Sequence, residues 1–364
     1  MMETPLPDLE AILLVGGQGT RLRPLTLGTP KPLLPTAGVP FLAHQLSRAR
    51  SFGVRRIVFA TSYRAEMFSE AFGDGSAFGL SLEYMTEETP LGTGGAIRNA
   101  AEALTCGPDA PVLVLNGDIL SGHDIGAQVA MHVERRAAVT LHLTEVDDPT
   151  RFGCVPTDDE GRVTAFLEKT PNPVTNRINA GCYVFTRSVI DTIPAGEVVS
   201  VERETFPSMI EAGVPVLGYA DASYWLDVGT PAAFVKGSRD LVLGRLHSPA
   251  LPGPTGEFLA LPGAVVSPEA KVEGGSTVGA RAVVESGAQV SGSVLSDECV
   301  VHEGATVVDS VIGIGAEIFP GAVLRGAVIG DGAVVGSGNE LLAGSRLWPG
   351  VVLPECAVRF SSDV

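Results

Sequence analysis

The sequence predicts an α/β domain built on a mainly parallel β-sheet, followed by a second domain that is a three-sided coil of short β-strands. Three observations lead to this expectation. Short apolar runs alternate with amphipathic stretches in the first part of the 364-residue chain, a Pro- and Gly-rich stretch then interrupts that order, and aliphatic residues recur every six positions beyond it. We expect domains at 1–246 and 261–364, with a linker at 247–260 whose composition (HSPALPGPTG at 247–256) is typical of a loop.

The first part alternates strand-like and helix-like segments, which predicts a Rossmann-like, mainly parallel sheet covered on both faces. In such sheets, ligands bind at the carboxyl ends of the strands. The predicted strands are 11–15, 56–61, 80–85, 111–116, 137–146, 162–168 and 180–185. The predicted helices are 40–52, 63–72, 95–104, 201–212 and 231–243.

The six-residue spacing runs from Val266 to Leu353, with occasional five-residue steps that make the later repeat 17 residues long. It fits a coil in which one aliphatic residue per side points inward and small residues turn the corners. Many of the 44 glycines lie here for that reason. The pattern resembles the hexapeptide repeats of left-handed β-helices, and an irregular β-sandwich is the alternative interpretation.

Composition excludes several classes of function. The formal net charge is −17 and no Lys/Arg cluster is present, which disfavours nucleic acid and anionic membranes as partners. No apolar run approaches the ~20 residues of a membrane span, and no signal peptide precedes the first strand. The five cysteines lie far apart, without a CxxC pair, so neither a zinc site nor a disulfide framework is indicated. We expect a cytoplasmic protein.

The strongest local signal directly follows the first predicted strand. Residues 16–26 read GGQGTRLRPLT, and Pro30-Lys31-Pro32 follows. Glycines let backbone N–H groups approach phosphate oxygens, and the side chains of Arg21 and Lys31 add positive charge beside them. The segment is neither a Walker loop nor a GxGxxG dinucleotide loop. A plain glycine-rich turn is the alternative.

These residues resemble the nucleotidyltransferases that make NDP-sugars, whose signature GxGTRLxPLT followed by PKP is met at every fixed position. The resemblance implies transfer of a nucleotidyl group from an NTP to a sugar 1-phosphate, with release of pyrophosphate and Mg²⁺ as cofactor. It also implies that Arg21 acts on the departing pyrophosphate and that Lys31 holds phosphate. The implied nucleotide contacts in and before the loop are Leu14, Gly16, Gly17, Gly19, Thr20 and Arg21.

Two aspartates are implied as metal ligands by the same resemblance. Asp118 ends the apolar strand 111–116, and Asp227 lies in a Trp-x-Asp-x-Gly motif. Mg²⁺ prefers few carboxylates together with phosphate oxygens and water, which suits such a pair. A helix cap at Asp118 and a surface turn at Asp227 are the alternatives. The resemblance thus gives the catalytic set Arg21, Lys31, Asp118 and Asp227.

The resemblance also implies contacts to the sugar and the base. Lys169 would bind the sugar's phosphate, Glu168 and Asn179 its hydroxyls, and Gly153 the sugar through its backbone. An exposed Glu-Lys pair is the alternative at 168–169. The loop at 88–95 would wrap the base, where an ordinary glycine-rich helix start is the alternative. The implied base-side residues are Glu88, Leu91, Gly92, Thr93 and Asn116.

Several segments resemble the mannose-1-phosphate guanylyltransferase branch: His44-Gln45, Thr61-Ser62-Tyr63, 87–93 and 201–207. GTP and mannose 1-phosphate are therefore the expected substrates. The alternatives are a thymidylyl-, uridylyl- or adenylyltransferase acting on glucose 1-phosphate, a non-catalytic relative that binds NDP-sugar, and a hexapeptide acyltransferase with His302 as base. Stacked coils have exposed ends and faces that suit self-association, so we expect a homo-oligomer.

Overall fold

The computed structural model describes residues 9–62 and 64–359. Their contacts divide the chain into two compact units, each made of two segments: Met1–Gly17 with Gln45–Trp225, and Gln18–His44 with Leu226–Val364. The division falls inside helix α1 (Phe41–Ser51). The boundaries near 246 and 261, which were expected from composition, stay a prediction.

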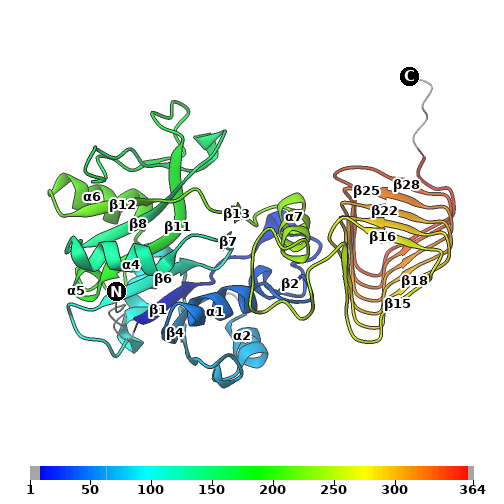
Figure 1. Ribbon diagram of the computed structural model, residues 1–364, viewed down its shortest axis with the longest axis horizontal. Coiled ribbons are helices and arrows are strands. Elements are labelled where there is room, and N and C mark those ends of the chain that lie inside the picture. Colours follow the sequence, from blue (N-terminus) through cyan, green and yellow to red (C-terminus); the bar gives the residue numbers. More distant parts are fainter. Residues whose placement is uncertain (1–8, 63, 360–364) are drawn as a thin grey trace. The chain divides into compact units, whose positions relative to one another are not determined.

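The first unit is built on a nine-stranded mixed sheet (Figure 1). β1 pairs in parallel with β4 on one side and β6 on the other, and β4 pairs in parallel with β5. β11 runs antiparallel to β6 and to β8. Its strands are β1 (Leu9–Leu14), β4 (Val54–Thr61), β5 (Ser81–Thr86), β6 (Pro111–Asn116), β8 (Val139–Glu145), β9 (Gly153–Cys154), β10 (Leu167–Glu168), β11 (Arg177–Thr186) and β12 (Val216–Ala220).

The central strands are apolar because both of their faces are covered. β1 and β6 are buried over nearly their whole length, which explains their continuous apolar sequence. Helical segments connect the strands, as the alternating pattern predicted. They are α1, α2 (Ala65–Phe72), α3 (Gly92–Ala100), α4 (Ile125–Glu134), α5 (Arg187–Ile190), a π-helix (Val201–Thr205) and α6 (Phe206–Glu211).

Two local predictions were wrong in detail. Only Leu167–Glu168 of the expected strand 162–168 forms a strand, because Arg162 and Val163 make isolated bridges without a continuous partner. Helix α3 begins at Gly92 rather than near residue 95. Gly92 has a φ of +70°, a conformation that glycine adopts without strain, so the chain turns into the helix earlier than expected.

The second unit contains a coil of three parallel sheets (Figure 1). The first sheet is β14 (Phe258–Ala260), β17 (Ser276–Val278), β20 (Val294–Leu295), β23 (Val311–Ile312), β26 (Val328–Ile329) and β29 (Arg346–Leu347). The second is β15 (Val265–Val266), β18 (Val283–Val284), β21 (Val300–Val301), β24 (Glu317–Ile318), β27 (Val334–Val335) and β30 (Val352–Leu353). The third is β16 (Lys271–Glu273), β19 (Gln289–Ser291), β22 (Thr306–Val308), β25 (Val323–Arg325) and β28 (Glu340–Leu341).

The register of the coil confirms the repeat, and the three parallel sheets of short strands agree with the predicted left-handed β-helix. Val294 pairs with Val311, one 17-residue unit further along the chain. The residues of the hexapeptide pattern point inward, and Val301 and Ile318 are fully buried. Glycines are required where coils approach closely. A Cβ at Gly279 would lie 2.4 Å from the carbonyl carbon of Ser296.

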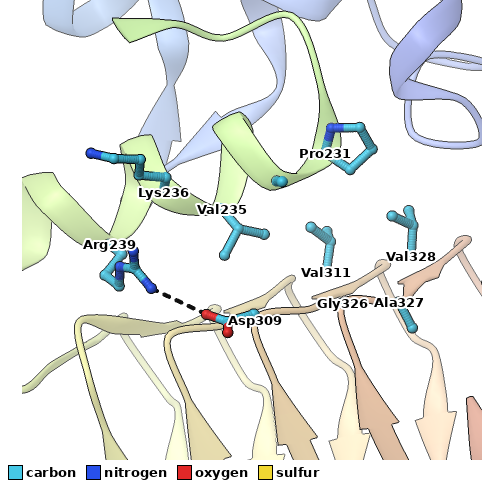
Figure 2. A pocket seen from close by; sticks show the side chains of 10 residues that line it. Pro231, Val235, Lys236, Arg239, Asp309, Val311, Gly326, Ala327 and Val328 are labelled. Atoms are coloured by element: carbon cyan, nitrogen blue, oxygen red, sulfur yellow. Dashed lines mark hydrogen bonds and ion pairs between the residues drawn. The ribbon is translucent and has the colours of Figure 1, made fainter. Parts of the chain in front are cut away.

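Helix α7 (Pro231–Val242) packs against the first sheet of the coil within the second unit. The Ser238 hydroxyl lies 3.2 Å from the Thr277 hydroxyl, and Arg239 forms a 3.1 Å ion pair with Asp309. Figure 2 shows this pair at one end of a cavity of about 310 Å³ between helix and coil. The cavity is lined by Pro231, Ala232, Val235, Lys236, Arg239, Asp309, Val311, Gly326, Ala327 and Val328.

Candidate active site

Asp118 lies in a tight turn at the carboxyl ends of β1 and β6. Leu14 and Asn116 are register partners, and the N–H of Gly117 donates to the Leu14 carbonyl at 2.8 Å. A Cβ at Gly117 would lie 2.6 Å from that oxygen, so only glycine allows this approach. The Gln45 side chain donates to the carbonyls of Asn116 and Ile119, at 2.9 and 2.6 Å. The turn is thus fixed on both sides of Asp118.

Gly16 and Gly17 continue from β1 into the signature loop. The N–H of Val15 donates to the Ala60 carbonyl at 3.1 Å and holds the strand end in place. Gly17 has a φ of +122°, which favours glycine. A Cβ at Gly16 would lie 3.1 Å from the Ser62 hydroxyl. Gly17 therefore meets a constraint of the backbone, and Gly16 leaves room for the Ser62 hydroxyl.

The remaining loop residues belong to the second unit. The Thr26 hydroxyl donates to the Gly19 carbonyl at 2.9 Å, and a Cβ at Gly19 would lie 3.0 Å from the Cβ of Lys31. Thr20 opens a short 3-10 helix, Thr20–Leu22, directly after Gly19. The loop therefore folds back on itself and brings Gly19 and Lys31 together.

Arg21 and Asp227 meet at Gly229 within the second unit. A Cβ at Gly229 would lie 2.9 Å from Arg21 Nη2 and 3.0 Å from Asp227 Oδ1. The glycine of the Trp-x-Asp-x-Gly motif thus makes room for a guanidinium and a carboxylate. Two predicted catalytic side chains, far apart in sequence, are brought together here.

Three predicted sugar-side residues lie together, Gly153 on β9, Glu168 on β10 and Lys169 in the turn that follows β10. Gly153 is the register partner of Glu168, and a Cβ at Gly153 would lie 2.7 Å from the Phe166 ring. Glu168 Oε1 and Lys169 Nζ form an ion pair at 3.1 Å. The N–H of Lys169 donates to the Phe152 carbonyl at 3.1 Å. The half-buried carboxylate of Glu168 and the exposed ammonium of Lys169 form a polar pair at this edge of the sheet.

Asn179 begins a bulge in β11 that leads to Asn116. Its side-chain N–H donates to the Tyr183 hydroxyl at 2.8 Å, and its Oδ1 accepts the Gly181 N–H at 3.1 Å. Gly181 has a φ of +76°, and a Cβ there would lie 2.8 Å from Asn116 Nδ2. The fold therefore places a predicted sugar contact beside a predicted nucleotide contact.

Tyr183 and Trp225 support this bulge, and neither was among the predicted site residues. Burial raises the pKa of the Tyr183 hydroxyl well above its usual value, so the oxygen that accepts the Asn179 hydrogen bond belongs to a neutral phenol. The indole N–H of Trp225 donates to the Ala180 carbonyl at 2.9 Å. A glycine within a strand indicates a bulge, so Gly181 was the available signal for this local geometry.

The predicted base loop, residues 88–95, lies at the start of α3. Glu88 and Gly92 are exposed, and Leu91 and Thr93 are half-buried. Glu87 Oε2 accepts the N–H of Leu91 at 3.2 Å, and burial raises the pKa of the Glu87 carboxyl. The Glu87 carboxylate therefore holds the backbone of the loop at Leu91.

The two predicted metal ligands, Asp118 and Asp227, belong to different units, so their meeting at one ion stays a prediction. Within residues 9–62 and 64–359, no group of three or more His, Cys, Asp or Glu side chains is arranged to hold a metal. Tyr63, one of the residues that resembled the guanylyltransferase branch, lies outside the described residues.

His302, the base that an acyltransferase would need, is held by two carboxylates. Its Nδ1 lies 3.2 Å from Glu285 and its Nε2 lies 3.3 Å from Glu317. Both ring nitrogens are therefore occupied within the coil. The described helices include none with the length and apolar character that a bilayer crossing requires.

Comparison with known proteins assigns the family. Residues 10–242 match the model of the family described as nucleotidyl transferase, and residues 262–346 match the GlmU-like C-terminal hexapeptide model. The chain belongs to the nucleotidyl transferase family, which confirms that it is an enzyme of the class that the signature loop indicated.

The predicted resemblance to one branch of this family is also confirmed. The chain is 56% identical over 358 residues to a mannose-1-phosphate guanylyltransferase of Mycobacterium tuberculosis, covering 98% of this chain and 99% of that relative. It is 38% identical to a catalytic subunit beta of mannose-1-phosphate guanylyltransferase from Drosophila melanogaster, over 72% of this chain and 70% of the relative.

Among solved structures, HddC from Yersinia pseudotuberculosis is similar in fold. It has a TM-score of 0.56 and 27% identity, and the match covers 64% of this chain and 98% of HddC. A second HddC structure, complexed with GMP-PN, has a TM-score of 0.55. The likeness in fold therefore extends to a structure that contains a guanine nucleotide analogue.

Proposed function

We propose that this enzyme transfers GMP from GTP to mannose 1-phosphate, forming GDP-mannose and releasing pyrophosphate. The similarity to the Mycobacterium tuberculosis mannose-1-phosphate guanylyltransferase carries this proposal, because it extends over nearly the whole of both chains.

The proposed reaction is a direct displacement. A phosphate oxygen of the sugar phosphate attacks the α-phosphorus of the nucleotide, the bond to the β-phosphate oxygen breaks, and pyrophosphate leaves. Arg21 and Lys31 stabilise the negative charge of the leaving group, and Lys169 binds the phosphate of the sugar. The work of the protein is therefore positioning and charge stabilisation.

We propose Mg²⁺ as the cofactor, with Asp118 and Asp227 as its protein ligands. The residues fit the ion in their chemistry, because carboxylate oxygens are ligands that Mg²⁺ prefers, and the turn that carries Asp118 is fixed by Gly117 and Gln45. Two carboxylates would be the few protein ligands that Mg²⁺ prefers beside phosphate oxygens and water. When bound, Mg²⁺ would neutralise phosphate charge during transfer.

A substrate panel tests the proposal. GTP, ATP, UTP, dTTP and CTP are each combined with mannose, glucose and N-acetylglucosamine 1-phosphate, and pyrophosphate release is measured. The highest kcat/KM is expected for GTP with mannose 1-phosphate. A preference for glucose 1-phosphate with dTTP, UTP or ATP would identify one of the alternative transferases. Binding of NDP-sugar without turnover of any pair would identify a non-catalytic relative.

Asp118→Asn tests the metal assignment. The variant removes one anionic ligand, so pyrophosphate release should fall by about 100-fold or more while the thermal unfolding midpoint stays unchanged. Asp109→Asn, at an exposed loop position, is the matched control and should retain wild-type activity. Near-normal release by a folded Asp118→Asn variant would remove this residue from the metal site.

We further propose that the protein is a cytoplasmic homo-oligomer that associates through the second sheet of the coil. The cysteines are free thiols, which suits a reducing compartment. Inward residues alternate with outward ones along each strand. The outward column of the second sheet is Val265, Val283, Val300, Glu317, Val334 and Val352.

The outward residues of the other two sheets differ between a sheet that is covered and one that is not. In the first sheet, which α7 packs against, the outward residues Val294, Val311 and Val328 are buried. In the third sheet the outward residues are mostly polar: Lys271, Gln289, Thr306, Val323 and Glu340. Five of the six outward residues of the second sheet are valines; Val265 and Val352 at its ends are 57% and 65% exposed, and the central ones are half-buried. A second coil with the same strand spacing would match it.

A double substitution tests the oligomer. Val300→Glu with Val334→Glu places two charges on the outward column and should reduce the mass measured by light scattering. Val323→Glu makes the same change on the polar third sheet and should leave the mass unaltered. A wild-type protein that is monomeric at micromolar concentration would reject the self-association proposal.

A further inference from the structure

The segment Val199–Glu204 binds the start of helix α3, which carries the predicted base loop. The Val199 carbonyl accepts the N–H groups of Gly94 and Gly95, at 2.8 and 3.3 Å, and the Val199 N–H donates to the Leu91 carbonyl at 2.9 Å. Helix α3 has no side-chain cap of its own. A remote segment therefore satisfies the backbone donors that the first turn of a helix leaves open.

The glycines of the loop permit this contact. A Cβ at Gly92 would lie 2.6 Å from the Val199 carbonyl oxygen, and a Cβ at Gly95 would lie 2.5 Å from the Glu197 carbonyl oxygen. Neither oxygen belongs to a side chain that could move away. The glycine-rich composition of the loop thus serves packing against residues 197–199.

One side chain joins the two segments. Glu202 Oε2 accepts hydrogen bonds from the hydroxyls of Thr93 and Ser200, at 2.7 and 2.8 Å. The Thr93 oxygen in turn accepts the Val201 N–H at 3.0 Å. Both donors share a half-buried carboxylate oxygen, and hydrogen bonds to a charged acceptor are stronger than neutral ones.

We propose that Glu202 is a positioning residue for the nucleotide: by holding the Thr93 hydroxyl, it keeps residues 91–95 in the conformation that binds the base. The inference rests on the proposed function, since that function makes the loop a nucleotide contact. Glu202 acts through Thr93 and needs no contact with either substrate. Its loss should therefore weaken GTP binding and leave mannose 1-phosphate binding unaffected.

Glu202→Ala in the full-length protein tests this. Isothermal titration calorimetry with GTP alone should show affinity weakened about tenfold or more, the range expected for losing hydrogen bonds to a charged group. The KM for GTP should rise in parallel. The KM for mannose 1-phosphate should change less than twofold. Glu202→Gln retains an acceptor oxygen and should recover most of the GTP affinity.

Thr93→Val keeps the shape of the side chain but removes the hydroxyl, and should weaken GTP binding as Glu202→Ala does. Because Glu202 acts through Thr93, the double variant should bind GTP no more weakly than Glu202→Ala alone. Glu211→Ala removes the same charge from the exposed end of α6 and should leave GTP affinity unchanged.

Wild-type GTP affinity in Glu202→Ala would overturn the inference. An equal rise in both KM values with a lowered unfolding midpoint would also overturn it, because that result indicates a general structural role. The two proposals can fail separately. If the wild type binds GTP but turns over no sugar phosphate, and Glu202→Ala still weakens GTP binding, the proposed function fails and the positioning role stands.

Discussion

At the scale of single residues, Gly229 lies next to two proposed catalytic side chains. Its missing side chain leaves space that the Arg21 guanidinium and the Asp227 carboxylate occupy, at 2.9 and 3.0 Å from where a Cβ would be. Both groups have proposed roles in the reaction, Arg21 toward phosphate and Asp227 toward the metal ion. A methyl group at this position would therefore displace the Arg21 and Asp227 side chains.

Gly229→Ala should lower kcat for pyrophosphate release by about 100-fold, since small displacements of catalytic groups have effects of that order. Its thermal unfolding midpoint should change little. Gly107→Ala is the control, because a Cβ at Gly107 meets no atom within 4 Å. Wild-type kcat in a folded Gly229→Ala variant would contradict the proposed roles of Arg21 and Asp227.

Buried histidine gives the stability a pH dependence. His132 in α4 is 3% exposed, and its ring nitrogens lie 3.0 and 3.2 Å from the hydroxyls of Thr140 and Thr186. Burial lowers the pKa of His132 from 6.5 to about 4. The folded state therefore binds this proton less readily than the unfolded state, and stability falls as the pH decreases from about 6.5 to about 4.

At pH 5, this single group should lower the free energy of unfolding by about 2 kcal/mol relative to pH 7.5. His132→Gln should lose less stability than the wild type over the same interval, because glutamine does not titrate. Urea unfolding of both proteins at the two pH values measures the difference. The other titrating groups are common to both, so equal losses would show that His132 does not titrate as described.

At the scale of elements, the coil strands stabilise the molecule through their inward residues. Leu324 is fully buried in the core of the coil, while its neighbour Val323 points outward and is half-buried. Leu324→Ala should lower the free energy of unfolding by about 2–5 kcal/mol, and Val323→Ala by less than about 1 kcal/mol. Chemical denaturation measures both. Equal effects would mean that the inward register is wrong.

The elements also show what the sequence could predict. The apolar run 111–116 and the six-residue spacing are local patterns, and both matched the structure because each records directly which side chains are buried. The expected strand 162–168 was wrong because a strand also needs a partner of equal length, which alternation alone does not reveal. The pairing of Glu168 with Gly153, by contrast, joins two residues that the motifs had already indicated.

The contacts around the site were less predictable for the same reason. Motif matching indicated Asn179 and Thr93, but the groups that hold them, Tyr183 and Glu202, become neighbours only when distant segments meet. The sequence signal for such partners is weak: a glycine in a strand, or an acidic residue with no evident role. Their identification required the fold.

At the scale of the whole molecule, α7 links the two sequence regions that composition had separated. It belongs to the first predicted domain, yet it packs on the coil. A Cβ at Gly275 would lie 2.7 Å from Arg239 and 2.9 Å from Leu243. The predicted linker packs against residue 38, because a Cβ at Gly38 would lie 3.2 Å from Pro252.

A fragment that ends at residue 246 should therefore fold poorly, because removing the coil exposes one face of α7. We expect increased binding of a hydrophobic dye and at least about a tenfold loss of pyrophosphate release, since exposed apolar patches promote aggregation. Size-exclusion chromatography and the enzyme assay measure these outcomes. A monomeric fragment with wild-type activity would show that the coil does not support α7.

The stacked coil has a consequence for how such a chain can vary in length. Within the coil, each turn contacts the turns above and below it, and neighbouring strands are about 4.8 Å apart. Arg346 on β29 also donates a 2.7 Å hydrogen bond to the Arg23 carbonyl in the signature loop. Inserting or deleting one complete turn before β29 would therefore move Arg346 by that step and break this contact, so the number of turns is tied to the position of the loop.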